Sequence, residues 1–211
     1  MPEIPLIKCT GCGACVHLCT KQAISLSENQ EGFLYPKVDD NLCVNCGLCE
    51  KNCPVNQSGK TAEKFSVRKA FACIVNDEKI REKSSSGGMF TVLAEKIIEE
   101  GGIVFGAEFD EDFSVKFGWT DSVEGLERFR GSKYLQARTE NIFSECKKYL
   151  EEGRKVLFTG TPCQVAGLKA FLKKDYENLY TVDFICHGVP SAELWQKYVK
   201  YREKKSASRT V

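Results

Sequence analysis

Beyond residue 69, the hydrophobic positions of the chain follow two different periods. Short apolar runs of strand length occur at residues 70–75, 102–109, 113–120, 155–160 and 179–186. Apolar side chains recur every three or four positions, as on one face of a helix, at residues 89–102, 139–153, 162–174 and 191–205. Strands that alternate with helices predict an α/β domain with a mainly parallel sheet.

Two of these helical segments indicate which face is buried. The first ends in a glycine pair suited to a C-cap, and its apolar face comprises Phe90, Leu93, Ala94 and Ile97. The second, at 139–153, has an apolar face of Ile142, Cys146, Tyr149 and Leu150. The first 57 residues are organised by cysteines instead, and the polar stretch at 58–69 reads as a linker. We therefore expect a small domain over 1–57 and an α/β domain over 70–211.

Composition and charge exclude several classes of function. The chain has 211 residues, of which 42% are hydrophobic and 28% charged, so a packed core is expected. With 30 basic and 29 acidic residues, the net charge of +1 gives no electrostatic footprint for nucleic acid. The apolar runs are far shorter than the ~20 residues of a membrane span, and no signal-peptide core precedes the first cysteines. A cytoplasmic protein is expected.

Eight of the twelve cysteines form two copies of one pattern. In each copy the four cysteines are separated by two, two and three residues: Cys9, Cys12, Cys15 and Cys19, then Cys43, Cys46, Cys49 and Cys53. Three thiolates within seven residues can surround one cubane cluster, whereas structural zinc usually uses two separated Cys-x-x-Cys pairs. The spacing favours 4Fe–4S clusters over zinc.

In bacterial-type ferredoxins with this spacing, the fourth cysteine of each run ligates the other cluster. Residues 1–57 resemble such a dicluster ferredoxin domain of the α+β class, although Thr20 stands where the first run would have proline. Because four cysteines complete each cluster, His17 is interpreted as a solvated loop residue. The expected ligands are Cys9, Cys12, Cys15 and Cys53 for the first cluster and Cys43, Cys46, Cys49 and Cys19 for the second.

Two further cysteines lie near predicted strand ends. The segment GTPCQ follows an apolar strand, and its Thr-x-x-Gln capping box and its proline predict a helix that begins after Thr161. Cys163 would then lie in the first helical turn, where aligned N–H groups favour a thiolate. Cys186 closes the predicted strand at 179–186, so both sulfurs are expected at the carboxyl edge of the sheet, where open α/β sheets bind ligands.

Three interpretations of Cys163 and Cys186 remain open on their residues alone. They are inert small residues, or Cys163 is a redox or nucleophilic thiol assisted by His187, or the pair contributes two ligands to a further cluster. Two other segments indicate an anionic cofactor or, equally, ordinary loops. Residues 83–90 place three serines and two glycines before a helix, and residues 129–137 offer Arg130 and Lys133 beside a glycine.

The segments SSSGG, RGSKYLQ, GTPCQVAGLK and DFICHGVPS, in this order behind the cysteine runs, resemble the coenzyme F-420 hydrogenase/dehydrogenase beta-subunit family over about residues 70–204. The resemblance implies FAD in the α/β domain and clusters that relay electrons. It makes Cys163 and Cys186 ligands of a third 4Fe–4S cluster beside the flavin. It places FAD near three segments: Ser84, Ser85, Ser86, Gly87 and Gly88; Arg130, Gly131, Ser132, Lys133 and Tyr134; and Gly160, Thr161 and Gln164.

Family members continue past residue 211 into a part with further cysteines, so the chain is expected to be a C-terminally shortened form. Its third cluster would need those cysteines or a partner. The expected function is an iron–sulfur oxidoreductase that passes electrons between FAD, or a hydride donor such as a reduced deazaflavin coenzyme, and low-potential clusters, with a redox partner protein or subunit. Arg130 and Lys133 would steady the charge of reduced flavin. The alternatives are a non-catalytic electron carrier or docking subunit, and a thiol-dependent transferase that uses Cys163.

Overall fold

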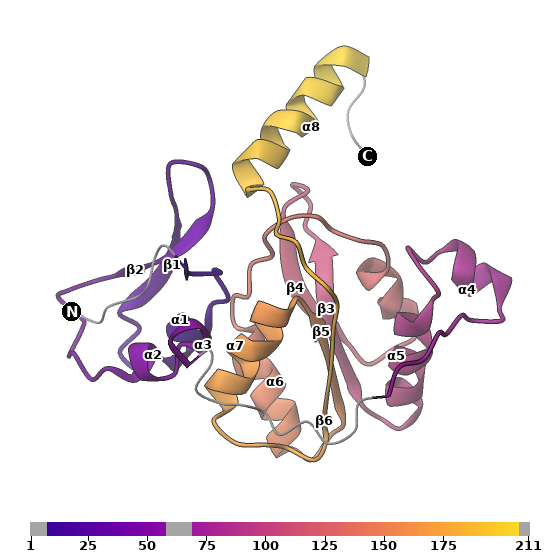
Figure 1. Cartoon of the computed structure of the whole chain (residues 1–211), viewed down its shortest axis with the longest axis horizontal. Helices are drawn as coiled ribbons and strands as arrows, with labels where there is room; N and C mark the ends of the chain where they lie inside the picture. The colour runs from indigo at the N-terminus through magenta and orange to yellow at the C-terminus, as the bar shows by residue number, and fades with distance from the viewer. Residues whose placement is uncertain (1–7, 58–68, 207–211) are drawn as a thin grey trace.

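The computed structural model describes residues 8–57 and 69–206 and shows two parts that pack against each other (Figure 1). The smaller part, in indigo and purple, carries the two cysteine runs. The larger part holds a four-stranded sheet. Nearly all of the predicted linker, residues 58–68, lies outside the described residues, so the linker stays a prediction.

The small domain combines two cysteine loops with an antiparallel hairpin of β1 (Ile24–Glu28) and β2 (Leu34–Val38). α1 (Ala14–Leu18) follows the first loop, and α2 (Leu48–Lys51) follows the second. Each helix begins behind a left-handed glycine, Gly13 at φ 79° and Gly47 at φ 70°. α3 (Pro54–Gln57) ends the domain. The two cysteine runs therefore build the same loop-and-helix unit twice.

The sheet of the large domain has the order β4–β3–β5–β6. β3 (Ile103–Phe109) and β4 (Val115–Thr120) form an antiparallel hairpin, whereas β3, β5 (Val156–Gly160) and β6 (Leu179–Asp183) run parallel. The predicted α/β domain with a mainly parallel sheet is confirmed, with one antiparallel strand at its edge.

Helices cover both faces of the sheet because successive strand residues point to opposite sides. Phe105 and Phe158 pack into a core with α6 (Ile142–Glu151) and α7 (Pro162–Leu172), while Val104 and Leu157 pack on the other face against α5 (Met89–Glu99) and the 3-10 helix η2 (Glu124–Phe129). The first core also includes Ala14 and Leu18 of α1. The small domain thus shares a hydrophobic core with the α/β domain.

Several predicted elements are confirmed and three are corrected. Residues 70–75 form no strand: Phe71 and Ile74 are 79% and 63% exposed, and the Val75 N–H makes a single backbone bond to the Gly87 carbonyl at 2.8 Å. The run has no partner among the described strands, so its hydrophobicity alone does not make it a strand. In α5, Thr91 is fully buried and Leu93 is exposed, because β3 and η2 approach from the Thr91 side.

The third correction concerns the end of β6. The strand stops at Asp183, so Cys186 does not close it but lies in the loop beyond, next to the 86% exposed Ile185. α8 (Ala192–Ser206) was predicted and projects from the body of the molecule (Figure 1). The Trp195 indole N–H anchors it to the Phe113 carbonyl at 3.0 Å. Within the two described ranges, no helix has the length and apolarity needed to cross a bilayer.

Candidate functional site

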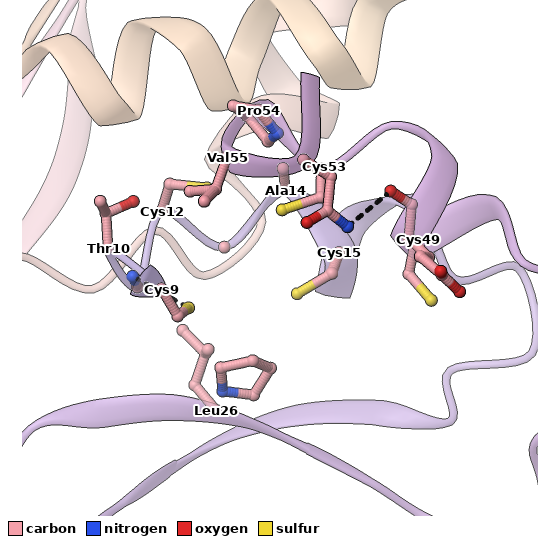
Figure 2. Close-up of a pocket in the computed structure, with 15 residues that line it drawn as sticks. Cys9, Thr10, Cys12, Ala14, Cys15, Leu26, Cys49, Cys53, Pro54 and Val55 are labelled. Atoms are coloured by element: carbon pink, nitrogen blue, oxygen red, sulfur yellow. Dashed lines mark hydrogen bonds between the residues drawn. The ribbon is translucent and has the colours of Figure 1, made fainter. Parts of the chain in front are cut away.

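The cysteines of the two runs line two separate cavities in the small domain. The first is lined by Cys9, Cys12, Cys15 and Cys53, with Cys49 at its side. Figure 2 shows the sulfurs of the first four around a common space, while the Cys49 sulfur lies apart. Leu26 and Pro36 of the hairpin form its apolar floor. Three of the four thiols come from the first run and the fourth, Cys53, from the second.

The second cavity is lined by the complementary set, Cys19, Cys43, Cys46 and Cys49. Here the crossing residue is Cys19, which α1 carries across to the second loop. The structure therefore groups the eight thiols into the two sets expected for crossed ligation.

The chemistry of these thiols fits a multi-iron cluster better than a single ion. No three Cys, His, Asp or Glu side chains in the described ranges converge closely enough to hold one metal ion. Burial, together with the neighbouring thiols, raises the pKa of Cys12 to about 11 and that of Cys15 to about 12. Thiolates held this close together need a positively charged partner in the space between them, and the irons of a cluster supply that charge.

The two cysteine loops differ in what surrounds them. A Cβ at Gly13 would overlap the Thr139 side chain of the α/β domain, whereas a Cβ at the equivalent Gly47 would meet no atom within 4 Å. Likewise, a Cβ at Gly11 would overlap the Gln136 side chain, but the equivalent position of the second loop is Asn45, which keeps the left-handed φ of 53°. The first loop is therefore docked on the α/β domain, and the corresponding glycine of the second loop faces open space.

Helix α7 brings the first cavity close to the end of β5. A Cβ at Gly167 would lie 3.3 Å from the Cys12 sulfur, so the glycine lets this helix pack tightly on the loop. The Cys163 thiol, one turn earlier on α7, lies within electrostatic range of Cys9 and Cys12. Its sulfur is 3.1 Å from Thr161 Oγ1. The predicted capping box is present, with Gln164 Oε1 accepting from the Thr161 N–H at 2.9 Å.

His17 is not the solvated loop residue that the sequence predicted. It lies on α1 with its ring centroid 4.5 Å from that of Phe143 and 5.6 Å from that of Phe171. Burial lowers its pKa to about 4, and its Nε2 atom has no hydrogen-bond partner. The neutral ring packs between the small domain and helices α6 and α7.

Two of the three segments predicted to bind flavin meet in the structure. The Ser132 N–H donates to Ser85 Oγ at 3.0 Å, which joins the serine loop before α5 to the loop after η2. Arg130 Nε donates to the buried Thr91 Oγ1 at 3.1 Å, and Lys133 Nζ donates to the Arg130 carbonyl at 2.8 Å. Burial lowers the pKa of Lys133 to about 8, although Glu108 opposes the shift.

The other residues of these two segments differ in accessibility. Gly131, at φ 78°, faces open space, and the Tyr134 side chain is exposed. Ser84 Oγ donates to the Ile80 carbonyl, and Ser86, Gly87 and Gly88 follow it into α5. A short α4 (Glu78–Glu82), capped by Asp77, precedes the loop and was not predicted. The third segment, Gly160 to Gln164, uses its hydrogen bonds internally and faces the first cysteine loop through α7.

Protein atoms lie close to where a side chain at Gly160 or Gly87 would begin. A Cβ at Gly160 would lie 3.1 Å from Gln164 Oε1 and 3.2 Å from the Phe117 ring. A Cβ at Gly87 would lie 2.6 Å from the Cys73 carbonyl oxygen. The contact at Gly87 is with a backbone atom, so a side chain there would disturb the fold, whereas the contacts at Gly160 are with side chains that would have to shift by a few tenths of an ångström.

Three contact residues, Gln136, Thr139 and Thr91, were not predicted from the sequence. Thr91 and Thr139 are buried at 0% and 2% exposure. Thr91 and Gln136 are polar residues among apolar neighbours, whereas Thr139 lies between two charged residues. The role of each depends on a contact with a distant segment. The glycine difference between the two cysteine runs was the one sign in the sequence that one loop is crowded and the other is not.

Comparison with known proteins agrees with this arrangement. Residues 8–57 match the model of the 4Fe-4S dicluster domain. Residues 70–143 match the N-terminal model, and residues 153–209 the C-terminal model, of the beta subunit of coenzyme F420 hydrogenase/dehydrogenase. The dicluster match supports two 4Fe–4S clusters, and the family suggests FAD.

Individual relatives are matched over only part of their own length. The chain is 36% identical over 187 residues to the coenzyme F420-dependent sulfite reductase of Methanocaldococcus jannaschii, which covers 86% of this chain but only 28% of that protein. It is 37% identical over 49 residues to an uncharacterized ferredoxin of the same organism, covering 23% of this chain and 62% of the ferredoxin. A chain of the F420-reducing [NiFe] hydrogenase complex from Methanosarcina barkeri superposes with a TM-score of 0.50 at 27% identity, covering 60% of this chain and 47% of that one.

The fold, the paired thiol cavities and the dicluster match define an iron–sulfur redox protein. Both halves of the beta-subunit model match in order behind the dicluster domain. The chain belongs to the coenzyme F420 hydrogenase/dehydrogenase beta-subunit family.

Proposed function

We propose that this protein transfers electrons between a two-electron hydride donor, a reduced deazaflavin coenzyme of the F420 type, and two 4Fe–4S clusters, with FAD bound in the α/β domain. The observation that carries the proposal is the docking of the first cysteine loop on α7, at the strand end where the α/β domain would hold its cofactor. The names of the sulfite reductase and hydrogenase relatives support F420 as the hydride carrier.

The ligand sets follow the two cavities. Cys9, Cys12, Cys15 and Cys53 would hold the first cluster, and Cys43, Cys46, Cys49 and Cys19 the second. The chain contributes thiolates and backbone N–H groups; the Gly11 N–H already points to the Cys9 sulfur at 3.4 Å. Such hydrogen bonds lower the electron density on ligand sulfurs and so tune the cluster potential.

The contacts of the two loops also set an order of electron transfer. The first site is covered by the α/β domain through Thr139, Gln136 and Gly167. The second site reaches the surface, because its ligand Cys46 and its neighbours Leu42 and Val44 are exposed. The first cluster would therefore be the inner one, next to the α/β domain, and the second the outer one, from which electrons would pass to a redox partner.

FAD, when bound, would exchange hydride equivalents on one side and single electrons on the other. The serine loop from Ser84 to Gly88 lies at the N-terminus of α5, whose free N–H groups suit the pyrophosphate. Arg130, held by Thr91, would pair with a phosphate or the flavin ring, and Lys133 would compensate negative charge near it. Gly131, Ser132 and Tyr134 would border the ligand, with Gly160, Thr161 and Gln164 at the end nearer the first cluster.

Cys163 and Cys186 remain candidate ligands of a third cluster that other cysteines or a partner subunit would complete. The placement of Cys163 beside Cys9 and Cys12 suits such a cluster, because it would lie between the flavin and the first cluster. Cys186 lies in an exposed loop, where its sulfur accepts from the Gly188 N–H at 3.4 Å. The proposed redox partner is a protein or subunit that contacts the second loop.

An alternative function is a ferredoxin-like carrier whose α/β domain only docks a partner. Anaerobic reconstitution with iron, sulfide and FAD, followed by desalting, distinguishes the two. The proposal predicts flavin absorbance bands above the broad cluster absorbance, and cluster bleaching on addition of reduced F420. Broad absorbance alone, with no bleaching by reduced F420 but normal bleaching by dithionite, would favour the carrier.

A further inference from the structure

The side chain of Gln136 joins the two domains through a paired hydrogen bond. The Leu34 N–H of β2 donates to Gln136 Oε1 at 2.7 Å, and Gln136 Nε2 donates to the Leu34 carbonyl at 3.0 Å. One side-chain amide thus satisfies both backbone groups of a strand residue, in the way that a neighbouring strand would. Leu34 and Gln136 are 102 residues apart and belong to different domains.

The backbone around Gln136 is firmly held on the α/β side. Its neighbours Leu135 and Ala137 are buried in the core that also contains Phe105 and Phe158. Two residues on, the Arg138 N–H donates to the Val115 carbonyl at 2.9 Å, and the Arg138 carbonyl accepts from the Phe117 N–H at 3.0 Å. The segment therefore runs along the β4 edge of the sheet, and only the Gln136 side chain extends this hydrogen bonding to β2.

The first cysteine loop lies against the same side chain. A Cβ at Gly11 would overlap Gln136 Nε2 and lie 2.9 Å from the Leu34 carbonyl oxygen. Gly11, Leu34 and Gln136 thus converge at one point beside Cys9 and Cys12. Any movement of the hairpin relative to the sheet would break the Gln136 pair and displace this loop.

We propose that Gln136 is a positioning residue that fixes the first cluster site against the α/β domain, so that electron transfer between the domains depends on its side-chain amide. This inference rests on the proposed function for its electron-transfer part. That Gln136 holds the first cysteine loop in place is inferred from the hydrogen bonds alone, and hydrogen exchange tests it separately from electron transfer. Gln136 does not touch the sulfurs and is not a ligand candidate.

The test compares Gln136→Leu, which removes both hydrogen bonds at similar volume, with Gln136→Glu, which keeps only the acceptor for the Leu34 N–H. Gln196→Leu is the matched control, because Gln196 also donates from its side chain to a backbone carbonyl, that of Asp112, but within the α/β domain. Hydrogen exchange is measured on the anaerobic, iron-loaded chain. Gln136→Leu should speed exchange of the Leu34 amide and of the first cysteine loop by about tenfold, about 1.4 kcal/mol. Gln136→Glu should speed exchange of the loop at least as much, because a carboxylate oxygen then faces the Leu34 carbonyl oxygen with no proton between the two acceptors.

Exchange in β3 and β5, the iron content and bleaching by dithionite should stay unchanged in all three variants. Cluster reduction through FAD should slow in both Gln136 variants, with Gln196→Leu like the parent. Unchanged exchange at Leu34 in Gln136→Leu, or equal acceleration in both domains, would overturn the positioning role. If the parent chain accepts no electrons through FAD, the proposed function fails, and the exchange result still decides whether Gln136 positions the loop.

Discussion

The unequal surroundings of the two cysteine loops predict unequal effects of the same substitution. Gly13→Ala and Gly47→Ala change equivalent residues, at φ 79° and 70°. A side chain in this left-handed region costs roughly 1–2 kcal/mol, offset by roughly 0.5–1 kcal/mol because alanine is less flexible than glycine in the unfolded chain. Both variants therefore lose about 1 kcal/mol for backbone reasons.

At Gly13 a second cost is added, because the new Cβ overlaps Thr139 Oγ1. Overpacking of this kind costs typically about 1–3 kcal/mol. Gly13→Ala should therefore open the domain interface about 2 kcal/mol more easily than Gly47→Ala, roughly a thirtyfold difference in the opening equilibrium. Hydrogen exchange of peptides from α6 and α7, on anaerobic iron-loaded protein, measures this opening.

A double-mutant cycle shows whether the overlap is the cause. Thr139→Ala removes the hydroxyl, and the next contact of the new Cβ is then the Thr139 Cβ at 3.3 Å. Gly13→Ala should lose more exchange protection than Gly47→Ala, and adding Thr139→Ala to Gly13→Ala should recover at least about half of that extra loss. Adding Thr139→Ala to Gly47→Ala should change protection only by the effect of Thr139→Ala alone. Equal exchange in Gly13→Ala and Gly47→Ala, or no relief from Thr139→Ala, would refute docking of the first loop.

Three further predictions concern the cofactors. Cys19→Ala should remove the paramagnetic resonance signal of the second cluster and spare the first, because Cys19 lines the cavity of the second run; damage confined to the first would contradict the crossed ligation. The reaction rate of the Lys133 amine with amine reagents should rise with pH with a midpoint near pH 8, because burial lowers its pKa. Bound FAD should protect this amine, and a midpoint above about 10 would contradict its burial. Arg130→Leu should weaken FAD binding at least about tenfold at unchanged iron content, measured by flavin fluorescence, and normal affinity would remove Arg130 from the flavin site.

The sequence predicted the elements whose patterns are local. The cysteine spacing, the Thr161–Gln164 capping box and the strand and helix periods each lie within a few residues, and the structure contains the elements that they predict. The exception is the apolar run at 70–75, which had a strand-like composition but no partner strand. Cys186 was misplaced for a related reason, because β6 ends where β5 stops pairing with it, at Gly160 and Asp183.

Long-range contacts were out of reach of pattern reasoning. His17 has the sequence surroundings of an exposed loop residue, but Phe143 and Phe171, more than a hundred positions away, cover it. The glycines at 87 and 160 were interpreted as room for a ligand, which stays a prediction, and protein atoms also lie close beside both positions. A glycine requires a close neighbour or a left-handed backbone, and only the fold shows which neighbour it is.

The order of the two clusters is the central claim, and freeze-quench paramagnetic resonance tests it most directly. The FAD-loaded chain is mixed with reduced F420 in two variants, Cys9→Ala, which disables the first cluster site, and Cys43→Ala, which disables the second, each checked for loss of one cluster by iron content. The account predicts that the first cluster is still reduced at the parent rate in Cys43→Ala, while the second cluster is reduced at least about tenfold more slowly in Cys9→Ala. Reduction of the second cluster at the parent rate without the first would contradict the account.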